Sequence, residues 1–135
     1  MGIRYEKDSI VDWANELGKF LRLIVDKYNA FDEPVAADIL EDGYLNFFQK
    51  ERDWIHGVSE QELFAYVNKD LQEGQIRPLG LLILDDAKFS NVSSELKKSL
   101  FRKAKLLLNH ASERLEQFSF EDYERMTEIE NELLK

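Results

Sequence analysis

Residues 76–89 read IRPLGLLILDDAKF, and this stretch decides the fold. The run 79–84 is apolar on every side, and a run this short can form a buried strand or a buried helix. A lone strand has no partner for its backbone groups, whereas Leu79 and Ile83 keep the helical spacing and Pro78 fits a first helical turn. The stretch therefore predicts a helix over 76–89 that lies at the centre of the fold.

Helical periodicity continues on both sides of this stretch. Apolar residues recur every three or four positions, and only two prolines and six glycines interrupt the 135 residues. The pattern predicts one all-α domain over 1–135, in which about six helices with short connections pack as antiparallel helical hairpins. The expected helices run over 8–29, 34–57, 59–74, 76–89, 94–118 and 119–133.

Polar residues and glycines mark the expected helix ends. Asp32 offers a capping oxygen to the second helix. Ser59 and Ser119 are expected N-caps, because a serine oxygen accepts a hydrogen bond from a first-turn N–H. Gly74 is expected to end the third helix in the left-handed conformation. Gly43 lies inside the second helix, which it weakens by about 1 kcal/mol relative to alanine.

Composition excludes several classes of protein. The absence of cysteine rules out disulfides, thiolate metal sites and a cysteine nucleophile, and it fits a reducing compartment. The first residues carry no basic stretch followed by an apolar one, and no apolar run approaches the roughly 20 residues of a membrane span. We therefore expect a cytoplasmic protein that does not enter a membrane. The net charge of −9 argues against nucleic-acid binding.

No sequence motif for catalysis or cofactor binding is present. His56 and His110 are the only histidines, and neither has the spacing that places two metal ligands on one helical face. The sequence lacks a glycine-rich phosphate loop, a nucleophile elbow and a nucleotide fingerprint. We predict no catalytic, cofactor-binding or metal-binding residue, which favours a role other than that of an enzyme.

Asp86 is the carboxylate that the pattern places inside the protein. It follows Leu82 by four residues on an apolar side of the expected central helix. A buried acid needs a partner, and here the candidates are a tyrosine hydroxyl, Arg77 and Arg102. Such a residue serves either as a structural ion-pair partner or, less often, as a general base.

Two sets of residues are candidates for contacts with a partner. Phe48 and Tyr66 lie off the main apolar stripes of their helices, so we expect them to be exposed. A basic cluster follows the central helix and contains Lys97, Lys98, Arg102, Lys103 and Lys105. These cations form either a solvated helix face or a docking site for an acidic partner. The candidate partner-binding residues are Phe48, Tyr66, Lys97, Lys98, Arg102 and Lys105.

Part of the chain resembles one tetratricopeptide-type (TPR-like) helical hairpin, over residues 76–115. The likeness is carried by the pair Leu79 and Gly80 in the first helix and by the aromatic-x-x-Ala spacing of Phe101 and Ala104 in the second. The resemblance implies hairpins that stack and bind peptides or proteins on a concave face.

A second resemblance extends over more of the chain. The segments 5–10, 16–21 and 119–121 read YEKDSI, ELGKFL and SFE. They are similar to a family of small bacterial all-helical proteins that has no assigned activity. This resemblance implies a bacterial, cytoplasmic, all-helical protein and assigns no functional residue.

Two functions fit these observations. The first is a protein-interaction or assembly module that binds a protein partner, or a second copy as a homodimer, through a helical surface. The alternative is a small-ligand sensor or enzyme with a carboxylate-lined pocket around Asp86. The missing catalytic motifs and the many aromatic residues favour the first.

Overall fold

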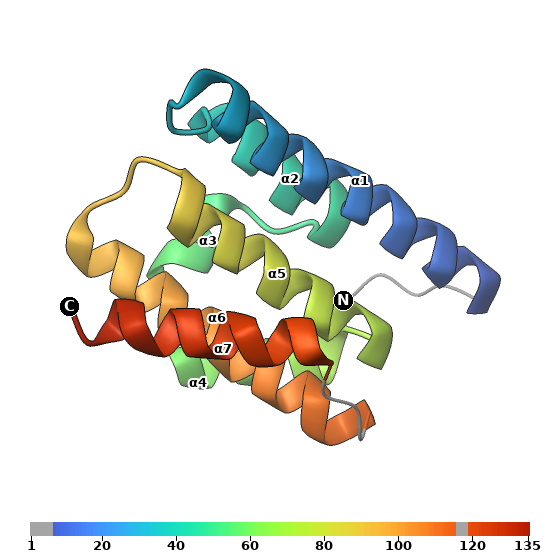
Figure 1. Ribbon diagram of the computed structural model, residues 1–135. Helices are drawn as coiled ribbons and strands as arrows, with labels where there is room; N and C mark the ends of the chain where they lie inside the picture. The colour runs from blue at the N-terminus through green and yellow to red at the C-terminus, as the bar shows by residue number, and fades with distance from the viewer. Residues whose placement is uncertain (1–6, 116–118) are drawn as a thin grey trace.

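The computed structural model describes residues 7–115 and 119–135, and over these residues the chain is all-helical, as predicted (Figure 1). Seven helices form in this part of the chain, and the only extended pairing there is an isolated bridge between Val35 and Ser90. None of the described helices combines the length and the apolar character that crossing a bilayer requires. The helices are α1 (Lys7–Phe31), α2 (Ala37–Phe48), α3 (Arg52–Gly57), α4 (Glu60–Asp70), α5 (Glu73–Phe89), α6 (Ser94–Leu115) and α7 (Phe120–Leu133).

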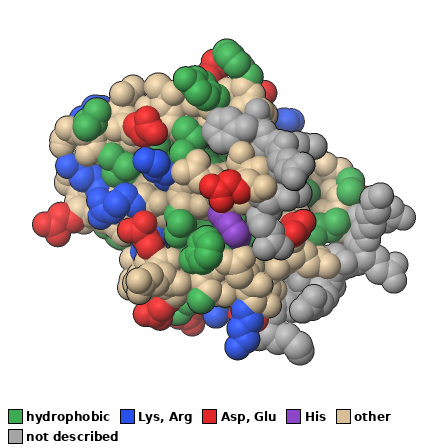
Figure 2. Space-filling view, turned by 90° about the horizontal axis from the view of Figure 1, so that it is seen from below, with side chains coloured by type: hydrophobic (Ala, Val, Ile, Leu, Met, Phe, Trp, Pro, Cys, Tyr) green, Lys and Arg blue, Asp and Glu red, His purple; other side chains and the backbone are tan. Residues whose placement is uncertain are grey.

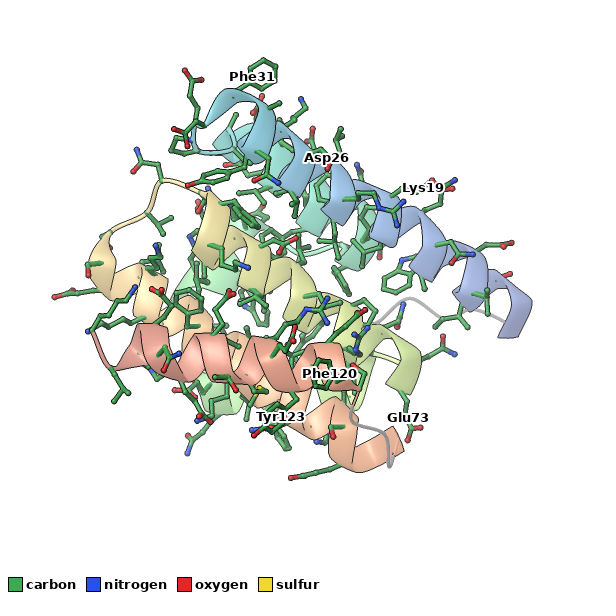
Figure 3. The ribbon with its side chains drawn as sticks, viewed as in Figure 1. Lys19, Asp26, Phe31, Glu73, Phe120 and Tyr123 are labelled. Carbon is green, nitrogen blue, oxygen red and sulfur yellow. The ribbon has the colours of Figure 1, made fainter. Side chains whose placement is uncertain are left out.

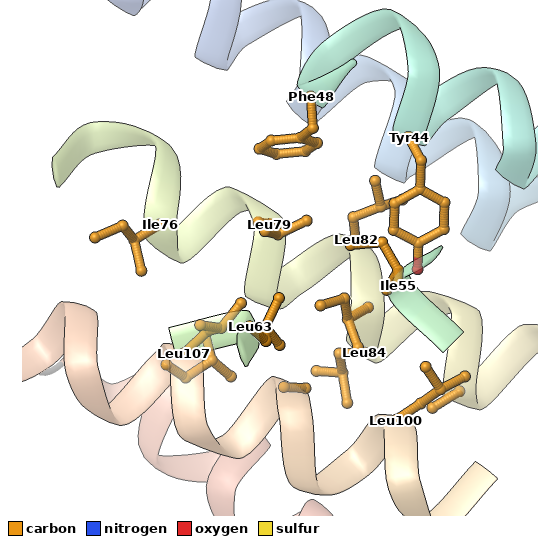
Figure 4. Close-up of a cluster of buried hydrophobic side chains, with 14 of the residues drawn as sticks. Tyr44, Phe48, Ile55, Leu63, Ile76, Leu79, Leu82, Leu84, Leu100 and Leu107 are labelled. Atoms are coloured by element: carbon orange, nitrogen blue, oxygen red, sulfur yellow. The ribbon is translucent and has the colours of Figure 1, made fainter. Parts of the chain in front are cut away.

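The stretch that predicts a central helix forms α5, which lies between α1 and α6 (Figure 1). Its most extensive interface is with α6, and α1 covers another side. Leu79, Leu82 and Ile83 have no exposed surface. Figure 4 shows Leu79 and Leu82 on the side of Tyr44 and Phe48 from α2, with Leu63 from α4 and Leu107 from α6 on the other side. The central position of 76–89 is therefore confirmed.

The predicted helix over 34–57 is wrong, because the chain breaks into α2 and α3. Gln49 adopts a left-handed conformation with φ of 56°, and its N–H bonds the carbonyl oxygen of Leu45 at 3.0 Å. The weak point is therefore Gln49 and not Gly43. A Cβ added at Gly43 would lie 2.5 Å from the ring of Phe20, so this glycine allows α1 and α2 to approach closely.

Two predicted helix ends are also wrong. Asp32 does not cap α2: it follows α1 with φ of 51°, and its N–H bonds the carbonyl oxygen of Tyr28 at 2.8 Å. Gly74 does not end a helix but lies in the first turn of α5, where Gln75 Oε1 accepts from the N–H of Gln72 at 3.0 Å. In both places the helix boundary lies a few residues from the position that the local pattern indicates.

The two serine caps are confirmed. Ser59 Oγ accepts from the N–H of Glu62 at 3.1 Å at the start of α4. Ser119 Oγ accepts from the N–H of Asp122 at 3.1 Å at the start of α7. These caps fix where α4 and α7 begin, and these two helices flank the exposed side of α6.

The α5–α6 interface depends on a close approach at Gly80. A Cβ added there would lie 3.2 Å from Cβ of Leu107, which is closer than ordinary van der Waals contact. We expect Gly80→Ala to lower the free energy of unfolding by about 1 kcal/mol or more, because the two helices must move apart. Chemical denaturation monitored by circular dichroism measures the change.

Gly18→Ala is the matched control for this substitution. Gly18 lies inside α1, and a Cβ added there meets no atom within 4 Å. We expect this variant to be more stable by about 0.5–1 kcal/mol, from helix propensity alone. Equal effects of the two substitutions would show that the close approach at Gly80 carries no cost.

Candidate functional site

Asp86 lies fully buried near the end of α5 and binds side chains from two other helices. The hydroxyl of Tyr44 donates to Oδ2 at 2.8 Å. Arg52 donates from Nη2 to Oδ1 at 2.8 Å and from Nε to Oδ2 at 3.2 Å. Tyr44 comes from α2 and Arg52 from α3, so one carboxylate joins three helices.

His56 and Ser90 complete the coordination of this carboxylate. His56 Nε2 lies 2.8 Å from Oδ2, and Ser90 Oγ donates to Oδ1 at 2.8 Å. Ser90 Oγ also bonds the backbone carbonyl oxygen of Asp86. We call this group the Asp86 network, and its members are Tyr44, Arg52, His56, Asp86 and Ser90.

The electrostatics of the Asp86 network keep the carboxylate ionised. Burial by itself raises the pKa of Asp86, but the hydrogen bonds from His56 and Arg52 and the charge of Arg52 lower it more, so that it lies well below its usual range. Burial and the adjacent Asp86 raise the pKa of Tyr44, which keeps that phenol protonated as a donor. Because both carboxylate oxygens are fully hydrogen-bonded, Asp86 is poorly placed to accept a proton from a substrate.

Lys103 of α6 fixes the other end of α3. Its side chain is buried, and Nζ donates to the carbonyl oxygens of Ile55 at 2.9 Å and His56 at 3.0 Å. These are carbonyls at the C-terminus of a short helix, where a cation is favoured. Burial lowers the pKa of Lys103. The six residues of α3 are therefore held on one side by Asp86 and on the other by Lys103.

The predicted burial of Asp86 is confirmed, and so is a tyrosine hydroxyl as one partner. The arginine that pairs with Asp86 is Arg52, which no sequence pattern indicated. Arg77 instead binds Asp122 of α7 in a bidentate pair at 2.7 and 2.8 Å. Arg102 lies on the surface beside Glu60. Arg52 and Asp86 are 34 residues apart, and no local spacing indicates that they meet.

The expected exposure of Phe48 and Tyr66 is wrong. Phe48 is 3% exposed, and its ring packs edge-on against Trp13 at 5.3 Å. Tyr66 is 8% exposed, packs against Trp54 at 5.2 Å and donates from its hydroxyl to the carbonyl oxygen of Phe48 at 3.4 Å. These short helices are covered on more than one side, so residues off the main apolar stripe are also buried.

Other aromatic side chains of the described residues are exposed instead. Phe64 of α4 is 37% exposed, whereas its neighbour Leu63 is fully buried. Phe120 and Tyr123 lie on the outside of the first turn of α7 (Figure 3). The signal available for Phe64 was that Leu63 and Val67 by themselves make a sufficient buried stripe.

A groove runs along α6 between α4 and α7. It consists of two adjoining hollows of 360 and 380 Å³ that share Glu60 and Leu106. We call it the α6 groove. Its lining residues are Glu60, Gln61 and Phe64 from α4, Arg102, Lys105, Leu106 and Asn109 from α6, and Leu133 from α7. Figure 2 views this lower side of the molecule and shows hydrophobic side chains beside lysine and arginine side chains.

The predicted basic cluster does not form one site. Arg102 and Lys105 line the α6 groove, whereas Lys97 and Lys98 line a separate hollow of 320 Å³ with Lys135. Lys103 points inward to α3. Whether Lys97, Lys98, Arg102 and Lys105 bind a partner stays a prediction. Among the described residues, no group of three or more His, Asp or Glu side chains is placed to hold a metal ion.

Comparison of the chain with protein-family models, with curated protein sequences and with solved structures finds no match. The two family resemblances therefore stay predictions. Function is inferred from the geometry of the Asp86 network and the α6 groove.

Removing the charge of Asp86 leaves the buried guanidinium of Arg52 without its counterion. We expect Asp86→Asn to lower the free energy of unfolding by about 3 kcal/mol or more, because an uncompensated buried charge is costly. Urea denaturation of both proteins at neutral pH measures the loss. Glu16→Gln breaks the exposed pair with Lys19, at 3.3 Å, and we expect it to cost less than about 0.5 kcal/mol. A small effect of Asp86→Asn would contradict a structural role for the Asp86 network.

Asp85 gives a second, pH-dependent test. Burial raises the pKa of Asp85 to about 7, against a weaker opposing effect of Lys88 and Arg125. Between about pH 4 and 7 the native protein therefore holds a proton that the unfolded chain releases, so this group lowers stability as the pH rises through that window. We expect Asp85→Asn to be more stable than the parent at pH 8, by roughly 1–3 kcal/mol, and to lose this advantage by pH 4. Thermal and urea unfolding at several pH values measure the difference, and a gap that does not change with pH would contradict it.

Proposed function

We propose that this chain is a non-enzymatic protein-interaction module that binds its partner in the α6 groove. The single observation that carries the proposal is the groove itself, in which Phe64, Leu106 and Leu133 from three helices expose apolar surface at one place. Partly exposed apolar residues that converge from separate helices are typical of protein-binding surfaces.

The arrangement of the helices supports this proposal. The walls of the α6 groove are α4 and α7. Serine caps at Ser59 and Ser119 fix where these helices begin, and the pair between Arg77 and Asp122 joins α7 to α5. A groove with fixed walls binds a partner at a lower entropic cost than a surface that must first become ordered. We further propose that neighbouring helices pair antiparallel, and that the chain binds a protein on its helical surface as TPR-like hairpins do. We also propose that it works in the cytoplasm of a bacterium.

The alternative function, a carboxylate-lined pocket around Asp86, has less support. A hollow of 450 Å³ borders the Asp86 network, but its lining includes Arg52 and Ser90 and not Asp86. Because the carboxylate oxygens are already hydrogen-bonded to the network, a ligand that reached them would have to displace a protein partner.

Substitution in the α6 groove tests the proposed function. We expect Phe64→Asp to remove a specific partner in affinity purification with quantitative mass spectrometry, because a carboxylate in the apolar wall opposes burial there. Leu23→Asp is the matched control, since Leu23 is an exposed apolar residue of α1, 49% exposed and away from the groove. A partner that both variants retain, or that both lose, would contradict binding in the α6 groove.

A further inference from the structure

The floor of the α6 groove is a regular strip of one helix. Arg102, Lys105, Leu106 and Asn109 stand at positions i, i+3, i+4 and i+7 of α6, which places them on one face. At 1.5 Å per residue this strip is about 10 Å long, or two helical turns. Side chains from the start of α4 and Leu133 at the end of α7 lie beside this strip, and a strip of this length can carry one helix lying along it.

The apolar residues of the α6 groove require that the bound helix has one apolar face. Phe64 lies on one wall, Leu106 on the floor and Leu133 on the other wall. A helix that lies along the floor turns one apolar face, made of side chains at i, i+3 or i+4, and i+7, toward this surface. Burial of this surface contributes about 25 cal/mol for each square ångström removed from water.

The α6 groove carries two cations on its floor, Arg102 and Lys105, against one acid, Glu60, so its charge complements an acidic occupant. Arg102 Nε lies 3.9 Å from Glu60 and Lys105 Nζ lies 3.8 Å from Glu130, and both distances exceed those of a charge-assisted hydrogen bond. By contrast, Arg77 reaches Asp122 at 2.7 Å. Arg102 and Lys105 therefore keep donors for carboxylates of a partner.

The negative net charge of the whole chain argues against two other occupants of the α6 groove, a second copy of the chain and a nucleic acid. A second copy carries a further net charge of −9, and nucleic-acid phosphates meet the same repulsion over a long surface. A short acidic helix carries few charges and places them directly over Arg102 and Lys105. At physiological salt the remaining acidic surface is screened beyond about 8 Å.

We propose that the α6 groove binds an amphipathic helix of another protein, with apolar residues on one face and Asp or Glu on its flanks. This inference rests on the proposed function, since it names the partner of the same groove. The apolar face packs on Phe64, Leu106 and Leu133, and the acidic flank accepts hydrogen bonds from Arg102 and Lys105.

Two designed peptides and a charge reversal test the inference. Each peptide has about 15 residues with leucines at helical spacing, and the flanks are Glu in one and Lys in the other. We expect the full-length protein to bind the Glu peptide in fluorescence anisotropy, with weaker binding at high salt. Arg102→Glu with Lys105→Glu should weaken this binding about tenfold or more and strengthen binding of the Lys peptide.

A matched variant separates the groove from total charge. Lys19→Glu with Lys27→Glu changes the net charge by the same amount on exposed positions of α1, and it should leave binding of the Glu peptide unchanged. Circular dichroism of each variant verifies the fold. Equal loss of binding in this control and in the groove variant would overturn the inference.

The outcomes distinguish the inference from the proposed function. If the parent protein prefers the Lys peptide and Phe64→Asp weakens it, the α6 groove is a binding site but its partner is not acidic. If sedimentation shows a dimer that Phe64→Asp dissociates, the occupant is a second copy. The α6 groove is then a binding site, but the inference of an acidic partner helix fails. If neither peptide binds, the inference fails, and if Phe64→Asp also leaves every partner bound in affinity purification, the proposed function fails with it.

Discussion

The ion pair between Asp86 and Arg52 is the interaction on which the rest of the structure depends. A carboxylate buried in a helical core is costly unless it is paired and hydrogen-bonded, and Asp86 meets this requirement with four side chains. Its partners come from α2, from α3 and from the end of α5, so the requirement also fixes how these segments meet. The six-residue α3 is too short to be stable as an isolated helix, and this network holds it in place.

The position of α3 determines the position of α4, and with it one wall of the α6 groove. Only Val58 and Ser59 separate the two helices, and Lys103 joins the end of α3 to α6 through two carbonyl oxygens. On the opposite wall, Arg77 performs a similar task by binding Asp122 at the start of α7. Buried and half-buried ion pairs thus orient both walls, whereas the loosely paired Arg102 and Lys105 lie on the floor. The tight pairs join helices of the core, whereas the loose pairs lie at the surface.

Local patterns predicted the features that depend on residues within about four positions. The serine caps at Ser59 and Ser119, the helix over 76–89 and the choice of Asp86 as a candidate buried acid follow from such patterns. The local patterns failed where two backbone conformations at a helix end were close in energy. At Asp32 and Gln49 the chain leaves the helix through the left-handed conformation, while each residue's N–H keeps the helical bond to the carbonyl four residues earlier.

The sequence by itself determined that the chain is helical and where a central apolar helix lies, because periodicity follows from the order of neighbouring residues. It singled out Asp86 as a candidate buried acid, and the structure decided that this acid is buried. Only the tertiary structure decided that Arg52 pairs with Asp86, that Phe48 and Tyr66 are covered, and that Phe64 is left at the surface. The physical reason is distance along the chain. Arg52 and Asp86 are 34 residues apart and Arg77 and Asp122 are 45 apart, so which side chains meet depends on how whole helices pack. The α6 groove has the same origin, since its walls and its floor belong to three different helices.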